Sequence, residues 1–144
     1  MFNVQVLRYN QDISVCFEIR KKVFCEEQKI PENVEFDQFE KKSLHILLSI
    51  DGENVATGRI TPKDDGNVHF SHIAVLSLGR KKGTGRELLT EMINESRKLG
   101  ASEITVNAQT YAVGFYEKLG FVICGNEQCN EYIRYVPMEK DLTE

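Results

Sequence analysis

The chain has 144 residues, of which 41% are hydrophobic and 28% charged, and this predicts a single globular domain over residues 1–144 with a substantial core. The formal net charge of −4 argues against a general nucleic-acid binder, since such proteins carry a basic face that replaces phosphate counterions. No apolar run approaches the ~20 residues of a membrane-spanning helix, so we expect neither nucleic acid nor a membrane as a partner.

The first third of the chain predicts a strand, a helix and an irregular segment. Residues 2–8 alternate between apolar and polar side chains, as a strand does. Asp12 can cap the helix that follows. The apolar side chains of this helix share roughly one side: Ile13, Phe17, Val23 and Phe24. Residues 28–37 contain Pro31 and several acidic residues, so we expect a loop or a broken helix that walls the substrate site.

The middle of the chain predicts consecutive strands. Residues 44–50 and 55–60 flank the dipeptide Asp51-Gly52, which is a strong signal for a hairpin turn. A second turn follows it and leads into a strand at residues 68–76.

The second half of the chain alternates between helix and strand. Apolar side chains recur at helical spacing from Gly85 to Leu99, and Gly100 supplies a stop. The expected elements that follow are a strand at 103–106, a helix at 112–119, and strands at 121–123 and 132–138. Strands first, then strand-helix-strand-helix-strand, predict an α/β or α+β domain with a mixed sheet.

A basic, glycine-containing loop joins the strand at 68–76 to the helix after it. The first N–H groups of a helix have no internal partner and carry partial positive charge, so an anion binds favourably there. We expect phosphate to be bound by these residues: Arg80, Lys81, Lys82, Gly83, Thr84, Gly85 and Arg86. The alternative is a plain turn with a solvated basic run. The loop matches neither a P-loop nor a dinucleotide fingerprint, so neither ATP chemistry nor hydride transfer is favoured.

A second motif follows the loop: Asn107-Ala108-Gln109 and then Phe115-Tyr116-Glu117-Lys118-Leu119-Gly120-Phe121. The pair resembles the GCN5-related N-acetyltransferase (GNAT) superfamily, with its acyl-CoA loop Arg/Gln-x-x-Gly-x-Gly/Ala and its later signature Phe-Tyr-x-x-x-Gly-Phe. The ElaA-like and YjcF-like branch is similar at Arg20, Val23, Phe24, Glu27, Gln28, Ile30, Pro31, Glu35, Asp37 and His45. The resemblance implies a mixed, mostly antiparallel sheet of six to seven strands, about four helices and splayed central strands.

The resemblance also implies an activity. The implied activity is that of an N-acetyltransferase, which would move an acetyl group from the co-substrate acetyl-CoA to a primary amine by direct attack in a ternary complex, without a metal. The backbone of Ile73-Ala74-Val75 would pair with the pantetheine arm, although the same residues can be ordinary sheet core. Asn107 would bond the CoA arm or cap the next turn.

Tyr116 is the expected catalytic residue, since a phenol can donate a proton or a hydrogen bond to the departing thiolate. It can instead be only a packing residue. An alkylamine is protonated at neutral pH, so a base is needed, and the candidates are Glu27, Glu35, Asp37, His45 and His72. The residues expected to bind a cationic acceptor are Glu27, Gln28, Glu35, Asp37 and His72. His72 stands where relatives have arginine, and Tyr135-Val136-Pro137-Met138 lacks a histidine found in relatives, so the acceptor or its base can differ.

Two other functions remain open: an acyl-CoA-binding sensor without catalysis, and a small interaction domain that binds another phosphate ligand. Four cysteines, at positions 16, 25, 124 and 129, show no metal-binding spacing, so we expect reduced thiols that take no part in the chemistry of a cytoplasmic protein. The expected partners are a small-molecule or peptide amine and, through edge strands near the C-terminus, a second copy in a homodimer.

Overall fold

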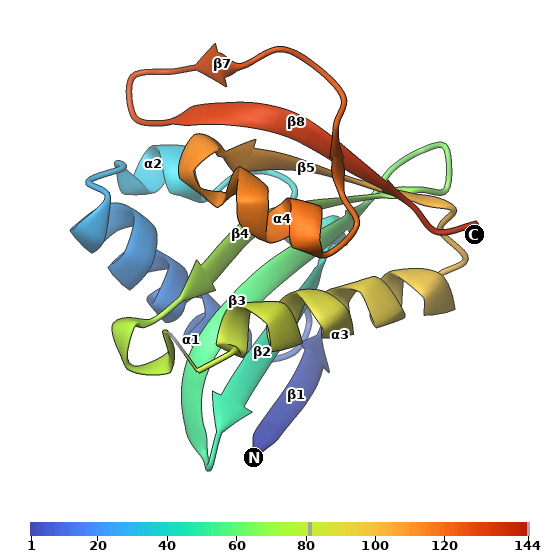
Figure 1. Cartoon of the computed structure of the whole chain (residues 1–144). Helices are drawn as coiled ribbons and strands as arrows, with labels where there is room; N and C mark the ends of the chain where they lie inside the picture. Colours follow the sequence, from blue (N-terminus) through green and yellow to red (C-terminus); the bar gives the residue numbers. More distant parts are fainter. Residues whose placement is uncertain (81, 144) are drawn as a thin grey trace.

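The computed structural model describes residues 1–80 and 82–143, apart from the side chains of residues 33 and 34. Its N-terminal half lays down four antiparallel neighbours in chain order (Figure 1): β1 (Phe2–Leu7), β2 (Leu44–Ile50), β3 (Glu53–Pro62) and β4 (Val68–Val75). Asp51 and Gly52 join β2 to β3 with positive φ angles of 48° and 87°, which is the geometry of the predicted hairpin turn.

The C-terminal half extends the same sheet. β4 pairs in parallel with β5 (Glu103–Gln109), and β5 pairs antiparallel with β8 (Arg134–Asp141). Two short strands, β6 (Val122–Ile123) and β7 (Gln128–Cys129), also pair with β8. The described residues thus form eight strands, against the six to seven expected. β6 corresponds to the strand predicted at 121–123, whereas the two-residue β7 leaves no alternating pattern in the sequence. The predicted α+β class with a mixed, mostly antiparallel sheet is confirmed.

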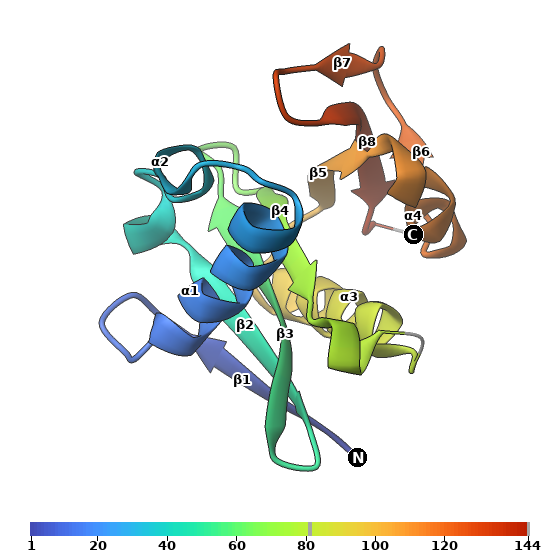
Figure 2. The ribbon, with the colours of Figure 1, turned by 90° about the vertical axis from the view of Figure 1, so that its left-hand side faces the viewer.

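Helices cover both faces of the sheet (Figure 2). On one face lie α1 (Ser14–Arg20), the π-helical turn η1 (Lys21–Glu27) and α2 (Glu32–Glu35); on the other lie α3 (Thr84–Lys98) and α4 (Val113–Lys118). The main core forms between the sheet and the α3 face, around buried side chains such as Ile46, Phe70 and Leu89. A smaller core under α1 contains Cys16, Ile19 and Phe24.

The helix predicted from residue 13 is correct in its apolar face but not in its regularity. The predicted cap at Asp12 is wrong by one position: Asp12 accepts hydrogen bonds from the backbone N–H and the hydroxyl of Ser14, but the N-cap residue is Ile13, whose side chain caps nothing. After Arg20 the helix widens into the π-helical turn, in which Gln28 N donates to Val23 O, five residues back. Apolar periodicity alone does not distinguish this turn from an α-helix.

The predicted helix at 85–99 corresponds to α3, and Gly100 ends it with a φ of 81°. Leu88, Leu89 and Met92 are fully buried against the sheet, as expected, whereas Leu99 is exposed because the helix has already ended. In the described part of the chain, no helix is both long and apolar enough to span a membrane.

The central strands diverge. β4 and β5 pair only where residues 68–70 face residues 104–106, and β4 then continues along β3 alone. The β3–β4 register shifts between Thr57 and Arg59, and His72 takes a left-handed φ of 54° at this bulge. The splay expected from the motif resemblance is therefore present, with the β5-facing edge of β4 unpaired beyond Phe70.

Candidate active site

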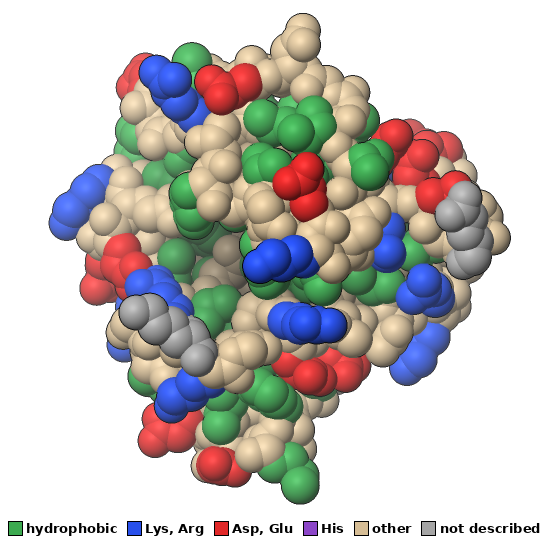
Figure 3. All heavy atoms as spheres, viewed as in Figure 1, with side chains coloured by type: hydrophobic (Ala, Val, Ile, Leu, Met, Phe, Trp, Pro, Cys, Tyr) green, Lys and Arg blue, Asp and Glu red, His purple; other side chains and the backbone are tan. Residues whose placement is uncertain are grey.

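A cavity of about 710 Å³ opens where β4 and β5 separate. Figure 3 shows the surface in the orientation of Figure 1, with a hollow left of centre and Lys and Arg side chains nearby. The predicted site residues that line this cleft are Glu27, Gln28, Glu35, His72, Ile73, Val75, Arg80, Gly85, Asn107 and Tyr116. They come from η1, α2, β4, the basic loop, β5 and α4, so folding brings together groups that are up to about ninety positions apart in the chain.

The other predicted residues lie elsewhere. Ala74 is buried in the core under α1, because the bulge at His72 changes which face its side chain occupies. Asp37 lines a neighbouring cavity of about 420 Å³. Thr84 is buried with its hydroxyl donating to Gly79 O. The remaining ones, Lys82, Gly83 and Arg86, are exposed around the start of α3, and Lys81 lies outside the described residues.

The start of α3 is suited to an anion. Gly83 precedes the helix with a φ of 75°, and no described side chain caps it. Among the described residues, no atom lies within 4 Å of the position that a Cβ at Gly83 would take, so none of them fills the space beside this residue. The reason for glycine at position 85 is different, because a Cβ there would lie 3.3 Å from the Phe115 ring. Gly83 therefore serves backbone conformation and access, and Gly85 serves packing.

Arg80 borders the cleft from the basic loop. Its Nε donates to Val75 O at 2.9 Å, and its Nη2 contacts Glu27 Oε1 at 2.7 Å. The guanidinium is thus already held in place beside the free edge of β4. Arg80 is the described basic side chain of the loop that lines the cleft.

Tyr116 reaches the cleft from α4. Its ring packs edge-on against Phe115 and Phe121, with centroid distances of 5.4 and 5.5 Å, and 6% of the residue is exposed. Burial, with a smaller contribution from Tyr111, raises the pKa of the Tyr116 hydroxyl. The hydroxyl therefore stays protonated at neutral pH and can donate a hydrogen bond.

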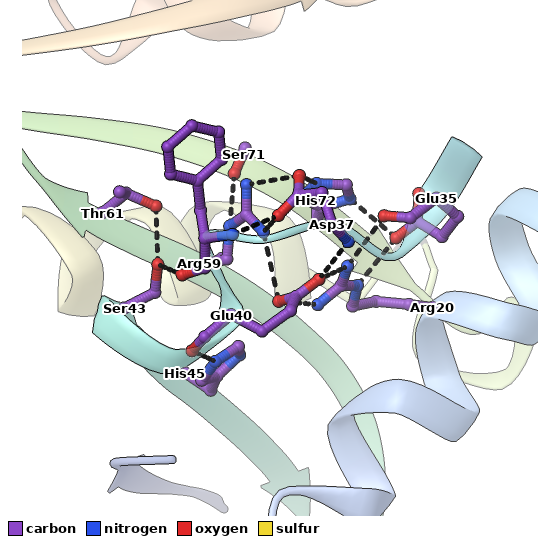
Figure 4. A network of polar contacts seen from close by, with 11 residues as sticks. Arg20, Glu35, Asp37, Glu40, Ser43, His45, Arg59, Thr61, Ser71 and His72 are labelled. Atoms are coloured by element: carbon purple, nitrogen blue, oxygen red, sulfur yellow. Dashed lines mark hydrogen bonds and ion pairs between the residues drawn. The ribbon is translucent and has the colours of Figure 1, made fainter. Parts of the chain in front are cut away.

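A buried network of ion pairs lies beside the cleft, on the side of α1 and α2 (Figure 4). Arg20, which is 1% exposed, contacts Glu35 Oε2 through Nε at 2.7 Å and Glu40 Oε2 through Nη2 at 2.8 Å. The guanidinium also lies 4.9 Å from the centre of the Phe36 ring. One arginine therefore joins α1, α2 and the turn at Glu40–Lys42.

Arg59 of β3 continues this network. It contacts Asp37 Oδ1 at 2.7 Å and Glu40 Oε1 at 3.1 Å through Nη1, and its Nε donates to Ser71 Oγ at 2.9 Å. Burial alone would raise the pKa of Glu40, but hydrogen bonds and charge from Arg20, together with the charge of Arg59, lower it to about 2. The pKa of Asp37 is lowered as well, because hydrogen bonds from His72 and Arg59 outweigh its burial.

His72 connects this network to the cleft. Its Nδ1 lies 2.6 Å from Glu35 Oε2 and its Nε2 lies 3.6 Å from Asp37 Oδ2, while Phe24 packs edge-on against the imidazole. Glu35 and Asp37, which the sequence predicted to face a cationic substrate, are thus already engaged by Arg20 and Arg59. The network therefore joins two arginines and three carboxylates to one imidazole at the cleft.

Two further histidines are not equivalent to His72. His45 is buried, its Nε2 lies 3.1 Å from Glu40 O, and it does not line the cleft, which removes it from the candidate bases. His69 lines the cleft although the sequence did not single it out, and its Nδ1 lies 2.8 Å from Thr105 Oγ1. Burial lowers its pKa to about 4. His69 and Ser71 could have been predicted as cleft residues, since they alternate with the apolar Phe70 along the predicted strand.

The model of the Acetyltransferase (GNAT) domain matches residues 13–142. Bacillus subtilis (strain 168) YjcF, an uncharacterized N-acetyltransferase, is 34% identical over 138 residues, which cover 94% of this chain and 97% of YjcF. Escherichia coli ElaA superposes with a TM-score of 0.86 at 22% identity, over 98% of this chain and 100% of ElaA. A GNAT family acetyltransferase from Elizabethkingia anophelis with acetyl-CoA bound has a TM-score of 0.77 at 14% identity, over 98% of each chain.

Proposed function

This chain belongs to the GNAT acetyltransferase family, and on that premise we propose that it transfers the acetyl group of acetyl-CoA to a primary amine. The observation that carries the proposal is one cleft lined by the unpaired edge of β4, by Arg80, by His72 and by Tyr116. Each of these can serve one requirement of the reaction: holding the thioester arm, holding phosphate, accepting a proton and donating one.

The residues present fit acyl-CoA. The free β4 edge, where Ile73 and Val75 line the cleft, offers backbone groups to an extended pantetheine arm. Arg80 and the uncapped N-terminus of α3 offer charge and N–H groups to the pyrophosphate. Asn107, exposed on β5, lines the cleft opposite and can bond the same arm.

His72 is the base that the geometry supports best. Glu35 and Asp37 are paired with arginines, His45 lies away from the cleft, and Glu27 is paired with Arg80. In the neutral imidazole the contact with Glu35 directs the Nδ1 proton toward a carboxylate, and Nε2, which lies 3.6 Å from Asp37 Oδ2, is the nitrogen that would take up a proton and share it with Asp37. The two nearby carboxylates would stabilise the imidazolium that results.

The proposed reaction then balances. His72 Nε2 takes a proton from the acceptor's ammonium, and the amine nitrogen attacks the thioester carbon. The C–N bond forms and the C–S bond breaks, with its electron pair leaving on sulfur, while the nitrogen loses its second proton to solvent and His72 then releases the proton it took. Tyr116 donates a hydrogen bond and then its proton to that sulfur, and regains a proton from solvent. The cysteines take no part in this direct transfer.

The test is release of free CoA thiol from acetyl-CoA in the presence of a panel of amines, for the wild type and Tyr116→Phe. The substitution keeps the ring that packs against Phe115 and Phe121 and removes only the hydroxyl. We expect release that depends on one class of amine and falls about 10²-fold in Tyr116→Phe, with CoA affinity nearly unchanged in calorimetry. Equal release by both proteins would remove Tyr116 as the acid. Binding of CoA without release for any amine would instead favour an acyl-CoA sensor.

A further inference from the structure

Two polar contacts cross the cleft from the end of η1. Glu27 Oε1 contacts Arg80 Nη2 at 2.7 Å, beside β4, and Gln28 Oε1 accepts a hydrogen bond of 3.1 Å from Gln109 Nε2, on β5. All four residues line the cleft. Glu27 and Gln28, which we call the strap, therefore tie the helical side of the cleft to both of the strands that separate there.

The backbone of the strap is unusual on both sides. A π-helical turn leads into it, and Gln28 N donates to Val23 O at 3.2 Å. Lys29, which follows it, has a left-handed φ of 63° although it is not glycine. Both conformations are uncommon and concentrate at functional sites, where surrounding contacts maintain them. The strap therefore differs from an ordinary helix C-terminus in its backbone conformation.

Arg80 is the residue that the strap holds. Its Nε is bonded to Val75 O while its Nη2 is paired with Glu27. The same groups are needed for acyl-CoA: the Arg80 charge for phosphate, and the Val75 backbone for the pantetheine arm. Glu27 and the phosphates of acyl-CoA would therefore compete for one guanidinium.

The Glu27–Arg80 pair can exchange partners easily. Its two side chains are 43% and 42% exposed, and exposed ion pairs contribute little net stability. By contrast, Glu35 is held by a buried arginine and His72, and Asp37 lies outside the cleft lining. Glu27 is thus the cleft carboxylate whose counter-ion a phosphate can remove.

We infer that Glu27 binds the ammonium group of the acceptor, and that Arg80 masks Glu27 until acyl-CoA draws Arg80 away. The inference rests on the proposed function, since it assigns the acceptor site of the same reaction. It makes binding sequential: acyl-CoA first, because its phosphates release Glu27, and a cationic amine second, because the freed carboxylate attracts it. An acceptor without a positive charge would gain nothing from this exchange.

Calorimetric titration with CoA tests the masking, with Glu26→Gln as a matched control for Glu27→Gln. Glu26 is the exposed neighbour on the same turn, so both variants remove one negative charge from the same region. We expect Glu27→Gln to bind CoA about two- to five-fold more tightly than Glu26→Gln, because Arg80 no longer has a competing partner. The KM for the amine should rise about ten-fold in Glu27→Gln alone. Equal CoA affinities, or weaker binding by Glu27→Gln, would overturn the inference.

An Arg80→Gln background supplies the second test. There the Arg80 charge that Glu27 holds is gone, so adding Glu27→Gln should leave CoA affinity unchanged. A gain that persists in this background would show that Glu27 acts through general charge rather than through Arg80. The two proposals fail separately: CoA binding without amine turnover in the wild type defeats the proposed function, whereas turnover without the CoA effect defeats only the masking. A wild type that does not bind CoA overturns both.

Discussion

His72 Nδ1 and Arg20 Nε contact the same oxygen of Glu35, at 2.6 and 2.7 Å. The carboxylate that orients the proposed base is thus itself oriented by a guanidinium that is 1% exposed. A side chain in the cleft is connected in this way, through two contacts, to the buried junction of α1 and α2. The position of His72 then depends on residues that touch no substrate.

His72→Asn tests the base. Asparagine adopts left-handed backbone conformations more readily than most residues, so the bulge at a φ of 54° should survive the change. We expect kcat to fall by about 10²- to 10⁴-fold, while CoA affinity stays the same because the proposed role of His72 concerns the acceptor and not CoA. Steady-state kinetics and calorimetry measure the two quantities. An unchanged kcat would assign deprotonation of the amine to another group.

The anion site at the start of α3 can be tested by charge alone. Gly83→Asp and Gly83→Asn have nearly the same shape, and both residues tolerate the φ of 75° that Gly83 adopts. We expect the aspartate to weaken CoA binding at least ten-fold more than the asparagine, because it places a carboxylate before the open N–H groups. Calorimetry measures both affinities, and equal losses would mean that the pyrophosphate lies elsewhere.

Arg20→Leu should destabilise the fold severely. The change leaves Glu35 and Glu40 buried without their main counter-ion, and breaking a buried ion pair typically costs about 3–5 kcal/mol. Urea unfolding measures the free energy. A triple variant that adds Glu35→Gln and Glu40→Gln should recover part of the loss, since the uncompensated charges are gone. A loss below about 1 kcal/mol in Arg20→Leu would show that the network is not a stability element.

Acid should unfold the protein in two overlapping ranges. Glu40 has a folded pKa of about 2 against an ordinary value of 4.5, so its stabilisation is present above pH 4.5 and is lost as pH falls through about 2. His69 has a folded pKa of about 4 against 6.5, so the unfolded chain gains a proton first and stability declines from pH 6.5 to about 4.

Urea unfolding between pH 7 and 3 separates these two contributions. His69→Gln should flatten the decline above pH 4, and Glu40→Gln should flatten it below pH 4.5, although at a lower overall stability. If His69→Gln leaves the decline in stability between pH 6.5 and 4 unchanged, burial of His69 is not its cause.

Local features were predictable from the sequence because neighbouring residues decide them. The hairpin at Asp51-Gly52 depends on two adjacent residues that accept positive φ, and α3 depends on apolar residues at helical spacing followed by Gly100. The basic loop and the Phe115-Tyr116 motif could likewise be identified from adjacent residues. The contact that a side chain at position 85 would make with Phe115 was not predictable, since it appears only in three dimensions.

The sequence by itself determined the class of fold, the order of its main elements and the motifs of an acyl-CoA site. Only the tertiary structure decided which charged residues are available to a substrate. Glu27, Glu35 and Asp37 look alike along the chain, but Arg80, Arg20 and Arg59 reach them from 53, 15 and 22 positions away. An ion pair depends on distance in space and on burial, neither of which is encoded in local sequence. These contacts give the three carboxylates different places: Glu27 pairs with Arg80 in the cleft, Glu35 contacts His72, and Asp37 lines the neighbouring cavity.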